Sequence, residues 1–523
     1  KDANPPKSSR IYALIAGRRI TKSVRELDHW GKVNTRTNRL KMNNGLKIAI
    51  LVSALGALVV IVASVLGFRV LPDVIKSRIE DEIALRPLSS TWDSWSDIDR
   101  PLYMNVYILN VTNPNTINTD GAPTYAQVGP YAFRQRRRKI NLSQADGERL
   151  VTYEQKTYYF FDPEVSGSNL RETDEINILN LPFYGFIGAM YRETIGIPGF
   201  VDHIANNILP NEKLTRPITV GQLMFDGLNA TYLIEAIRPN QTIPPADQII
   251  FGLYLGTNGT SDNIAYKIHT GVGDSSVFGT IVTVNGSTDL GFWNPLSECD
   301  AVKGTDGSIF PPFVTKGRTV EIYSSDICRS LYLRYDKEEE VKGIKGYRFT
   351  VPKEALEDPR TNKDNMCYCS PQDQALNACL GAGTIDVSAC KGSPFVMSTP
   401  FFLDGDEKYS AKTGLRPARD LHETALVIEP NSGALLKANK RIQLNFNFKQ
   451  FPNTSINAFR NIENMIFPIL WIDESMEFTD DNAEDLKDEL LNPKKAIETW
   501  RWVVLGVGIG LILGGMGIYV WKG

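Results

Sequence analysis

The stretch IAILVSALGALVVIVASVLGF, residues 48–68, decides the fold class of this chain, because its 21 residues carry no charge. A second uncharged stretch, WVVLGVGIGLILGGMGIYVW, covers residues 502–521 near the other end. Each stretch is long enough to cross a bilayer as a helix. A buried core helix is the alternative, but such a helix seldom runs this far without a polar face. We therefore predict transmembrane helices at residues 46–70 and 501–521.

The basic N-terminal segment predicts the orientation of both helices. Residues 1–45 carry eleven Lys and Arg against three acidic residues, which is typical of a cytosolic tail. The first apolar stretch begins too late and runs too long to be a cleavable signal peptide. Two crossings return the chain to the cytosol at residues 522–523, so we expect residues 71–500 outside the cell or in an organelle lumen.

Asn-x-Ser/Thr sequons support this topology, since they lie between the two predicted helices and none lies in either tail. Such sequons accept glycans in secreted segments. Chance supplies part of them, so they add support rather than proof. The predicted glycosylation sites are Asn110, Asn141, Asn229, Asn240, Asn258, Asn285 and Asn453.

The six cysteines all lie within residues 299–390, which indicates an oxidising compartment. They allow many pairings, and spacing alone cannot choose among them. A metal site is the alternative, but the region lacks the paired Cys-x-x-Cys units and the nearby His that zinc sites usually show. We predict a disulfide-rich region without a metal or cofactor.

The composition excludes one class of partner and the motifs argue against catalysis. With a formal net charge of −3, the chain has no basic excess to neutralise nucleic-acid phosphates. His422 and Glu423 begin like a zinc protease motif, but position 426 is Leu. A carboxylate pair for glycoside hydrolysis stays open, although no pattern indicates one. We predict that the chain is not an enzyme.

Residues 71–500 are predicted to be rich in short strands after a helical start. Apolar residues repeat every four positions from Leu71 to Ile83, so the first helix should continue beyond the membrane until Pro87. Strands are predicted at residues 102–109, 249–255 and 277–284. In residues 441–448 polar and apolar side chains alternate, which predicts one wet and one buried face.

Residues 176–237 are predicted to form a helical insertion, because the apolar period changes there. Thr219 and Gln222 have the spacing of a capping box. Ile204 and Ile208 belong to one apolar helix face.

An unusually apolar run within this insertion contains Phe183, Phe186 and Ile187. It is either ordinary core or a groove that admits an apolar ligand.

Several motifs together resemble the class B scavenger receptor family, the type that includes the fatty acid translocase also called platelet glycoprotein IV. The resemblance runs from about residue 46 to the second span. Within the family, the chain is similar to insect epithelial and sensory neuron membrane proteins. Its most specific pieces are Gly129-Pro130-Tyr131, Phe310-Pro311-Pro312-Phe313, Ser324-Ser325-Asp326-Ile327-Cys328-Arg329-Ser330, Cys367-Tyr368-Cys369 and Pro468-Ile469-Leu470-Trp471.

The resemblance implies an α+β ectodomain, with an antiparallel β-barrel core, short helices and a helical bundle at the membrane-distal apex. It implies a largely apolar tunnel through the barrel toward the bilayer. It also implies three disulfides, namely Cys299–Cys367, Cys328–Cys390 and Cys369–Cys379. A Lys in the cap can meet a fatty acid carboxylate in this family, and Lys213 is the nearest ammonium in the matching part of this chain.

The function implied is capture of fatty acids, sterols, carotenoids or lipid-like odorants at the cap and their transfer toward the membrane lipids. The candidate ligand contacts are Lys213, Phe183, Phe186, Ile187, Ile204 and Ile208. The alternative is a receptor that docks a protein, a lipoprotein or a microbe at the cap. The expected location is the plasma membrane, with an endosomal or lysosomal membrane as the alternative.

Three features of the ends complete the expectations. No cysteine lies beside either span, so palmitoylation there is not expected. The segment from Tyr12 to Ile15 resembles a tyrosine-based endocytic signal. Gly506, Gly510 and Gly514 suggest close packing against the first span or against a second copy of the chain, and we favour the first span.

Overall fold

The structure, a computed structural model, describes residues 44–193, 197–293 and 297–522. Its contacts divide the chain into two compact units, residues 1–71 with 497–523 and residues 72–496. Residues 1–43 of the predicted cytosolic tail, with the Tyr12 signal, lie outside the described residues.

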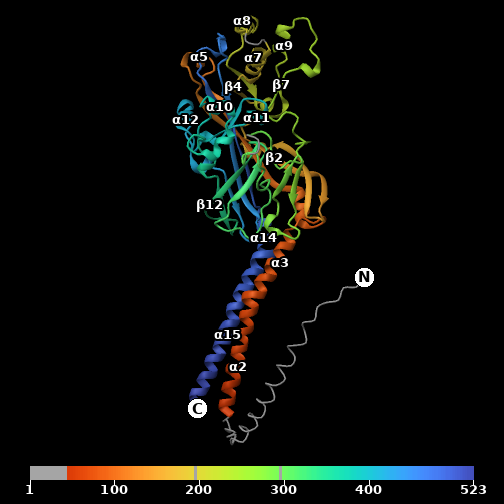
Figure 1. Cartoon of the computed structure of the whole chain (residues 1–523), viewed down its shortest axis with the longest axis vertical. Coiled ribbons are helices and arrows are strands. Elements are labelled where there is room, and N and C mark those ends of the chain that lie inside the picture. The colour runs from red at the N-terminus through yellow and green to blue at the C-terminus, as the bar shows by residue number, and fades with distance from the viewer. Residues whose placement is uncertain (1–43, 194–196, 294–296, 523) are drawn as a thin grey trace, which may run out of the picture. The chain divides into compact units, whose positions relative to one another are not determined.

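The first unit contains the two apolar helices. Helix α2 (Asn44–Val65) continues as a π-helical segment over Leu66–Val70, and α15 (Asn492–Lys522) holds the second apolar stretch. Both are long and apolar enough to cross a membrane, and they lie side by side (Figure 1). A Cβ atom built on Gly56 would lie 2.7 Å from the backbone oxygen of Gly508. The helices therefore pack where small residues allow their backbones to meet.

The glycines that make this contact differ from the predicted stripe. A Cβ atom on Gly515 would lie 2.8 Å from the backbone oxygen of Ala49, whereas one on Gly506, Gly510 or Gly514 meets nothing within 4 Å. Gly508 and Gly515 are seven residues apart, the repeat that faces a partner in a left-handed helix pair. The favoured pairing within the chain is present, but the predicted stripe does not make the contact.

The second unit begins with the predicted extension of the first helix, α3 (Leu71–Ile83). Helix α4 (Ser90–Ser96) follows, and the Ser89 side chain caps it by accepting a hydrogen bond from the backbone N–H of Trp92. The chain then enters the sheet. The remaining short α-helices of this unit outside the cap are α5 (Ile117–Asp120), α6 (Pro163–Ser166), α10 (Pro371–Ala375), α11 (Ser388–Lys391), α12 (Glu407–Thr413), α13 (Arg419–His422) and α14 (Asp480–Leu486).

One large antiparallel sheet forms the body of this unit. Its main path has the order β10-β9-β3-β2-β1-β18-β17-β16-β13-β12-β11, and β8, β14 and β15 pair beside it. The strands are β1 (Asp97–Val111), β2 (Tyr125–Ala145), β3 (Leu150–Phe161), β8 (Thr260–Ser261), β9 (Tyr266–His269), β10 (Ile281–Val284), β11 (Val320–Ser324), β12 (Arg329–Val341), β13 (Ile344–Thr350), β14 (Thr384–Asp386), β15 (Phe395–Ser398), β16 (Ala425–Ile428), β17 (Leu435–Phe448) and β18 (Met465–Glu477).

A short segment at Gly304 and Thr305 joins the two end strands and closes the sheet into a barrel. The backbone N–H of Ile281 in β10 donates to the oxygen of Gly304 at 2.8 Å. On the other side, the Thr305 N–H donates to the oxygen of Glu321 in β11 at 3.1 Å, and Tyr323 donates back to Thr305 at 2.9 Å. The antiparallel barrel implied by the resemblance is thereby present, with no free edge at this seam.

A mixed cap lies at the end of the barrel away from α14 (Figure 1). Its predicted helices are present, and Thr219 and Gln222 form the predicted capping box, with reciprocal hydrogen bonds of 3.1 and 3.2 Å. The cap also contains two strand pairs that the helical prediction missed. Its elements are β4 (Glu175–Leu179), α7 (Leu181–Glu193), α8 (Pro198–His203), π-helical segments at Ile204–Ile208 and Gln222–Asp226, β5 (Thr215–Thr219), β6 (Leu228–Asn229), α9 (Tyr232–Ile237) and β7 (Ile250–Phe251).

The predicted wet face of β17 is wrong in its middle. Gln443 and Asn445 are both fully buried, because residues 396–401 cover them. The Gln443 side chain accepts a hydrogen bond from the backbone N–H of Phe401 at 2.8 Å, and Asn445 donates to the backbone oxygen of Val396 at 3.0 Å. Buried amides are tolerated when they find such partners.

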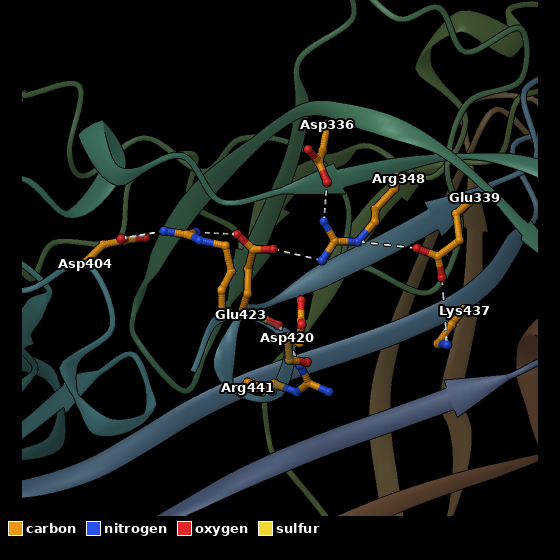
Figure 2. A network of polar contacts seen from close by, with 9 residues as sticks. Asp336, Glu339, Arg348, Asp404, Asp420, Glu423, Lys437 and Arg441 are labelled. Atoms are coloured by element: carbon orange, nitrogen blue, oxygen red, sulfur yellow. Dashed lines mark hydrogen bonds and ion pairs between the residues drawn. The ribbon is translucent and has the colours of Figure 1, made fainter. Parts of the chain in front are cut away.

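The outer face of β13 and β17 carries a network of paired charges, shown in Figure 2. Arg348 contacts Asp336 and Glu339 of β12, and its Nη2 lies 2.8 Å from Glu423 Oε2. Lys437 of β17 lies 3.8 Å from Glu339. Since the carboxylates come from neighbouring segments, the network ties these strands together on the outside of the barrel.

Candidate ligand conduit

The inner face of the barrel retains accessible apolar surface. Along β17, the inward Ile442 and Leu444 are only half-buried, whereas the outward Gln443 and Asn445 between them are fully buried. Ile472 of β18, in register with Ile442, is half-buried too. A packed core would bury these residues first. The inner face therefore keeps apolar surface that neighbouring side chains leave uncovered.

Aromatic side chains line the same face near the cap. The ring of Phe225 contacts two tyrosine rings. Its centre lies 5.0 Å from that of Tyr159 in β3 and 5.8 Å from that of Tyr254, in the segment after β7. Phe133 of β2 contacts Phe225 from the other side at 5.1 Å. All except Phe133 are half-buried. They form an apolar wall between the cap and the middle of the barrel.

A belt of charged and amide side chains crosses the inner face below this wall, and we call Gln135, Arg137, Asp326, Lys440 and Glu474 the polar belt. Arg137 forms an ion pair with Glu474, and Lys440 forms one with Asp326. Lys440 Nζ also lies 3.5 Å from Glu474 Oε2. Gln135 accepts from Arg137 at 2.7 Å and donates to Glu474 at 3.1 Å. The belt is thus one connected network with two positive and two negative charges.

The charges of the polar belt are strongly coupled, and two of the side chains that carry them keep free surface. Lys440 lowers the pKa of Asp326 to about 2, although burial opposes this shift. Burial lowers the pKa of Lys440, but Asp326 and Glu474 outweigh it and raise the pKa above its ordinary value. Yet the side chains of Lys440 and Asp326 are 37% and 49% exposed. Lys440 and Asp326 thus keep free side-chain surface although the surrounding protein partly removes their hydration.

Apolar residues flank the polar belt on both sides along the strands. On β17, Ile442 and Leu444 lie toward the cap from Lys440, and Ala438 lies away from it. On β18, Ile472 precedes Glu474 and Met476 follows it. Ala438 and Met476 border a further apolar cluster around Phe349 and Leu426. From the cap toward the opposite end of the barrel, the inner face is therefore first apolar, then charged and then apolar again.

A second ion pair beside the polar belt is sealed instead of open. Lys139 Nζ lies 2.7 Å from Asp306, its side chain is 1% exposed, and it lies 4.3 Å from the ring centre of Tyr153. Burial by itself would raise the pKa of Asp306. Lys139, Ser308 and Tyr153 lower this pKa by a larger amount, so the net pKa lies below the ordinary value. This pair is enclosed by the barrel wall and has almost no free surface at Lys139.

The disulfides position Asp326 of the polar belt. The structure joins Cys299 to Cys367, Cys328 to Cys390 and Cys369 to Cys379, the pairing that the resemblance implies. Asp326 lies in the turn between β11 and β12, two residues before Cys328. Because all six cysteines are bonded in pairs, the alternative of a Cys-based metal site is excluded. Among the described residues, no group of His, Cys, Asp and Glu could hold a metal ion.

Most of the predicted ligand contacts lie in the core of the cap. Phe183 and Ile187 are fully buried, and Phe186 and Ile204 are 6% and 1% exposed. Ile208 is 36% exposed. Of the two interpretations of the run that contains Phe183, Phe186 and Ile187, ordinary core describes these residues in this structure, and Ile204 is buried in the core as well. Their contact with a ligand stays a prediction.

Lys213 lies on the surface of the cap. Its Nζ donates to the side-chain oxygen of Asn115 at 3.1 Å, and the side chain is exposed. It is not part of the polar belt, so its role toward a carboxylate also stays a prediction.

The predicted glycosylation sites are mostly accessible. Six of the seven asparagines are exposed, and Asn110 is half-buried in β1, where its side-chain oxygen accepts from the Asn177 backbone at 2.7 Å. All seven lie in the second unit, as a lumenal or extracellular ectodomain requires.

A separate cavity of about 450 Å³ lies at the end of the barrel opposite the cap. Charged residues of α3 and of the following segments line it, among them Lys76, Glu80, Arg86 and Arg318. Its lining is polar, so it differs from the apolar inner face.

Sequence reasoning missed the polar belt, although a signal for it exists. The alternation predicted for β17 begins at Arg441, and Lys440, one residue earlier, continues the inward register of Ile442 and Leu444. In β2 the inward Gln135 and Arg137 are hidden in a run of charged neighbours. A charge in the apolar register of a strand is the feature that would have identified them.

Together, the two apolar helices and the large antiparallel barrel with its cap define a membrane protein with two spans and one large folded unit between them. Residues 54–519 match the CD36 family, and the chain belongs to this family. It is 32% identical to human Lysosome membrane protein 2 over 460 residues, which cover 87% of this chain and 91% of the relative.

Two insect relatives show comparable coverage. The chain is 26% identical to Sensory neuron membrane protein 1 of Manduca sexta, over 91% of each chain. It is 25% identical to Sensory neuron membrane protein 2 of Drosophila melanogaster, over 91% of this chain and 98% of the relative. The chain is a membrane protein of the scavenger receptor family, which is a family of receptors and not of enzymes.

Proposed function

We propose that this protein captures single lipid molecules at the cap and passes them along the inner face of the barrel toward the membrane. The observation that carries the proposal is the inversion in β17, where inward apolar residues keep free surface while outward amides are buried. Apolar surface lining an enclosed space is the environment that a lipid chain seeks when it leaves water.

The driving force is burial of the lipid chain, which contributes about 0.8 kcal/mol per methylene group. An apolar tube distinguishes ligands by length and width more than by bonding. We therefore expect broad acceptance of fatty acids, sterols, carotenoids and similar molecules. No reaction is required, because the membrane at the other end is a second apolar environment.

The orientation proposed is that both ends lie in the cytosol, with tails at residues 1–45 and 522–523 and the ectodomain at residues 71–500. The names of the relatives refer to the lysosome and to sensory neurons. For this chain we propose the plasma membrane, with the endosomal or lysosomal membrane as the second location.

The test is to count the lipid that the full chain retains after purification in detergent. Mass spectrometry of solvent extracts should find lipid in the wild-type protein and much less in Leu444→Trp, because the larger side chain fills the hollow. The matched control is Leu421→Trp, since Leu421 of α13 is 63% exposed on the outside. Equal lipid in both variants, or none in the wild type, would contradict the proposal.

A second candidate function is docking of a protein partner at the cap. The observation in its favour is that α8 and its flanks expose Ile197, Phe200 and Ile208, at 61%, 46% and 36%. Exposed apolar residues that lie together often mark an interaction site. Ile204 is unsuitable for a test because it is 1% exposed and a charge there would disrupt the core.

The docking candidate is tested by Phe200→Asp with Ile208→Asp in the full chain. Loss of partner binding, with normal folding and unchanged lipid content, would favour docking over lipid transfer. Retained partner binding would argue against a dock at α8.

A further inference from the structure

We infer that the polar belt is a head-group site inside the conduit, at which Lys440 binds the carboxylate of a single-chain amphiphile by exchange with Asp326. This inference rests on the proposed lipid conduit and deepens it, because it names the part of the ligand that the barrel recognises. An apolar tube alone has no means of preferring an acid over its ester.

The position of the polar belt requires any passing ligand to meet it. Its members come from β2, β17, β18 and the turn after β11, which lie on different parts of the barrel wall. Apolar residues occur toward the cap and away from it on both β17 and β18. A ligand whose tail rests on the apolar wall of Tyr159, Phe225 and Tyr254 thus has its polar end at the height of the charges.

Lys440 is the cation best placed for a ligand carboxylate. Its side chain keeps 37% of its surface free, compared with 24% for Arg137, which Gln135 and Glu474 hold from two sides. An ammonium has three N–H donors, and Lys440 uses them on Asp326 and, at 3.5 Å, on Glu474. Replacing Asp326 by a ligand carboxylate keeps the number of charged contacts at Lys440 unchanged.

Asp326 is the partner that can leave. It lies in a four-residue turn and is 49% exposed. Glu474 is in a strand, is 18% exposed and is held by Arg137 as well. Asp326 also keeps a second positive charge nearby, since Lys391 lowers its pKa and donates to the adjacent Ser325 backbone oxygen at 3.0 Å. Displaced from Lys440, it therefore stays compensated.

The charge count selects an anionic head group. The polar belt itself is balanced, with Lys440 and Arg137 against Asp326 and Glu474, and the exposed Lys391 beside Asp326 adds a third positive charge. With Lys391 counted, one bound carboxylate makes the set neutral, whereas a cationic head group would add a fourth positive charge. Unbalanced charge is costly where water is excluded.

The experiment measures binding of tritium-labelled hexadecanoate and of its methyl ester to the full chain, purified and transferred from detergent to amphipol. The two probes share the tail and differ in the charge of the head. In Lys440→Met we expect hexadecanoate to bind about tenfold more weakly, the usual loss for a charge-assisted hydrogen bond. The methyl ester should bind as it does to the wild type.

The matched control is Lys437→Met. Lys437 lies on the same strand, is 36% exposed and has its own carboxylates, Glu339 and Glu477, but it lies on the outer face (Figure 2). This variant should leave both probes unaffected. A general effect of removing a lysine from β17 would appear in it equally.

Asp326→Asn supplies a readout that a structural role would not produce. Freed from its competitor, Lys440 should bind hexadecanoate several-fold more tightly, while the methyl ester stays unchanged. This variant also keeps the inference testable if Lys440→Met does not fold, because the amide occupies the space of the carboxylate.

The outcomes separate the two proposals. If wild type binds both probes and neither Lys440→Met nor Asp326→Asn changes their ratio, the head-group site is wrong and the conduit stands. If Asp326→Asn weakens hexadecanoate, the exchange is wrong. If wild type binds neither probe, the proposed conduit fails and the head-group site fails with it.

Discussion

Lys139 and Asp306 form the most enclosed charge pair of the barrel wall, and this makes a stability prediction possible. Asp306→Asn removes the negative charge and leaves Lys139, 1% exposed, without its partner. An uncompensated buried charge costs about 3 to 5 kcal/mol. We expect urea unfolding, followed by tryptophan fluorescence, to show a loss of this size, since Trp95 lies beside Lys139 at 5.8 Å.

Two controls accompany this prediction. Glu298→Gln breaks the pair with Lys303, in which the side chains are 41% and 87% exposed, and should have no measurable effect. The double variant Lys139→Met with Asp306→Leu should recover most of the stability, because it leaves no charge unpaired. A double variant as unstable as the single one would contradict the explanation.

The same pair predicts how stability depends on pH. The folded-state pKa of Asp306 is lowered, so its contribution is present above the unfolded value of about 3.9 and is lost as pH falls through the lowered folded value. The difference in unfolding free energy between wild type and Asp306→Asn should therefore be constant from about pH 7 to 5 and shrink below about pH 4. A difference already lost at pH 5 would contradict the lowered pKa.

Single residues also show what the sequence could not reveal. Lys440 and Arg441 are adjacent in a strand, and alternation places them on opposite faces, but it does not say which face is hollow. The alternation predicted buried apolar residues and wet polar ones. The structure shows the reverse at Gln443 and Leu444, because a distant segment covers the outside of β17 and the inside stays open.

Among the elements, the closing segment of the barrel depends on one glycine. Gly304 has φ of +83°, and a Cβ atom there would lie 1.9 Å from the backbone oxygen of Glu321. Gly304→Ala should therefore cost about 1 to 2 kcal/mol for the left-handed backbone and about 1 to 3 kcal/mol more for the clash. We expect the loss in urea unfolding, with the seam between β10 and β11 exchanging amide protons faster.

Gly307 provides the control for the backbone term. Its φ is +82°, but a Cβ atom there would meet its nearest neighbour, Ile322, only at 3.4 Å. Gly307→Ala should show the backbone cost alone and leave amide exchange at the seam unchanged. Equal effects of both substitutions would mean that the close approach at Gly304 is unimportant.

Prediction of the elements succeeded where the pattern was local. The helix after residue 71, the capping box at Thr219 and the strand at residues 102–109 are all confirmed. The strands predicted at 249–255 and 277–284 are present only as Ile250–Phe251 and Ile281–Val284. Both segments are apolar because they contact the cap or the barrel, and burial without regular pairing leaves the same sequence pattern as a strand.

For the whole molecule, membrane attachment was readable from two stretches, since length and lack of charge suffice. The barrel and the disulfide pairing were not derivable from composition or spacing, and only the resemblance implied them. The free apolar surface of the inner face could not be predicted from either, because it depends on which side chains meet across the barrel. Its polar belt joins residues as far apart in sequence as Arg137 and Glu474.

The proposed orientation gives a prediction at this scale. Removal of the glycans by an endoglycosidase should shift the migration of the full chain in a gel, and Asn453→Gln, at an exposed sequon, should produce one step of that shift. Arg36→Thr creates a new sequon at Asn34 in the N-terminal segment. It should add no step, because glycans are added only on the lumenal side and positive residues hold this segment in the cytosol. A glycan on Asn34, or none on the ectodomain, would reverse the orientation and place the conduit on the wrong side of the membrane for capturing external lipid.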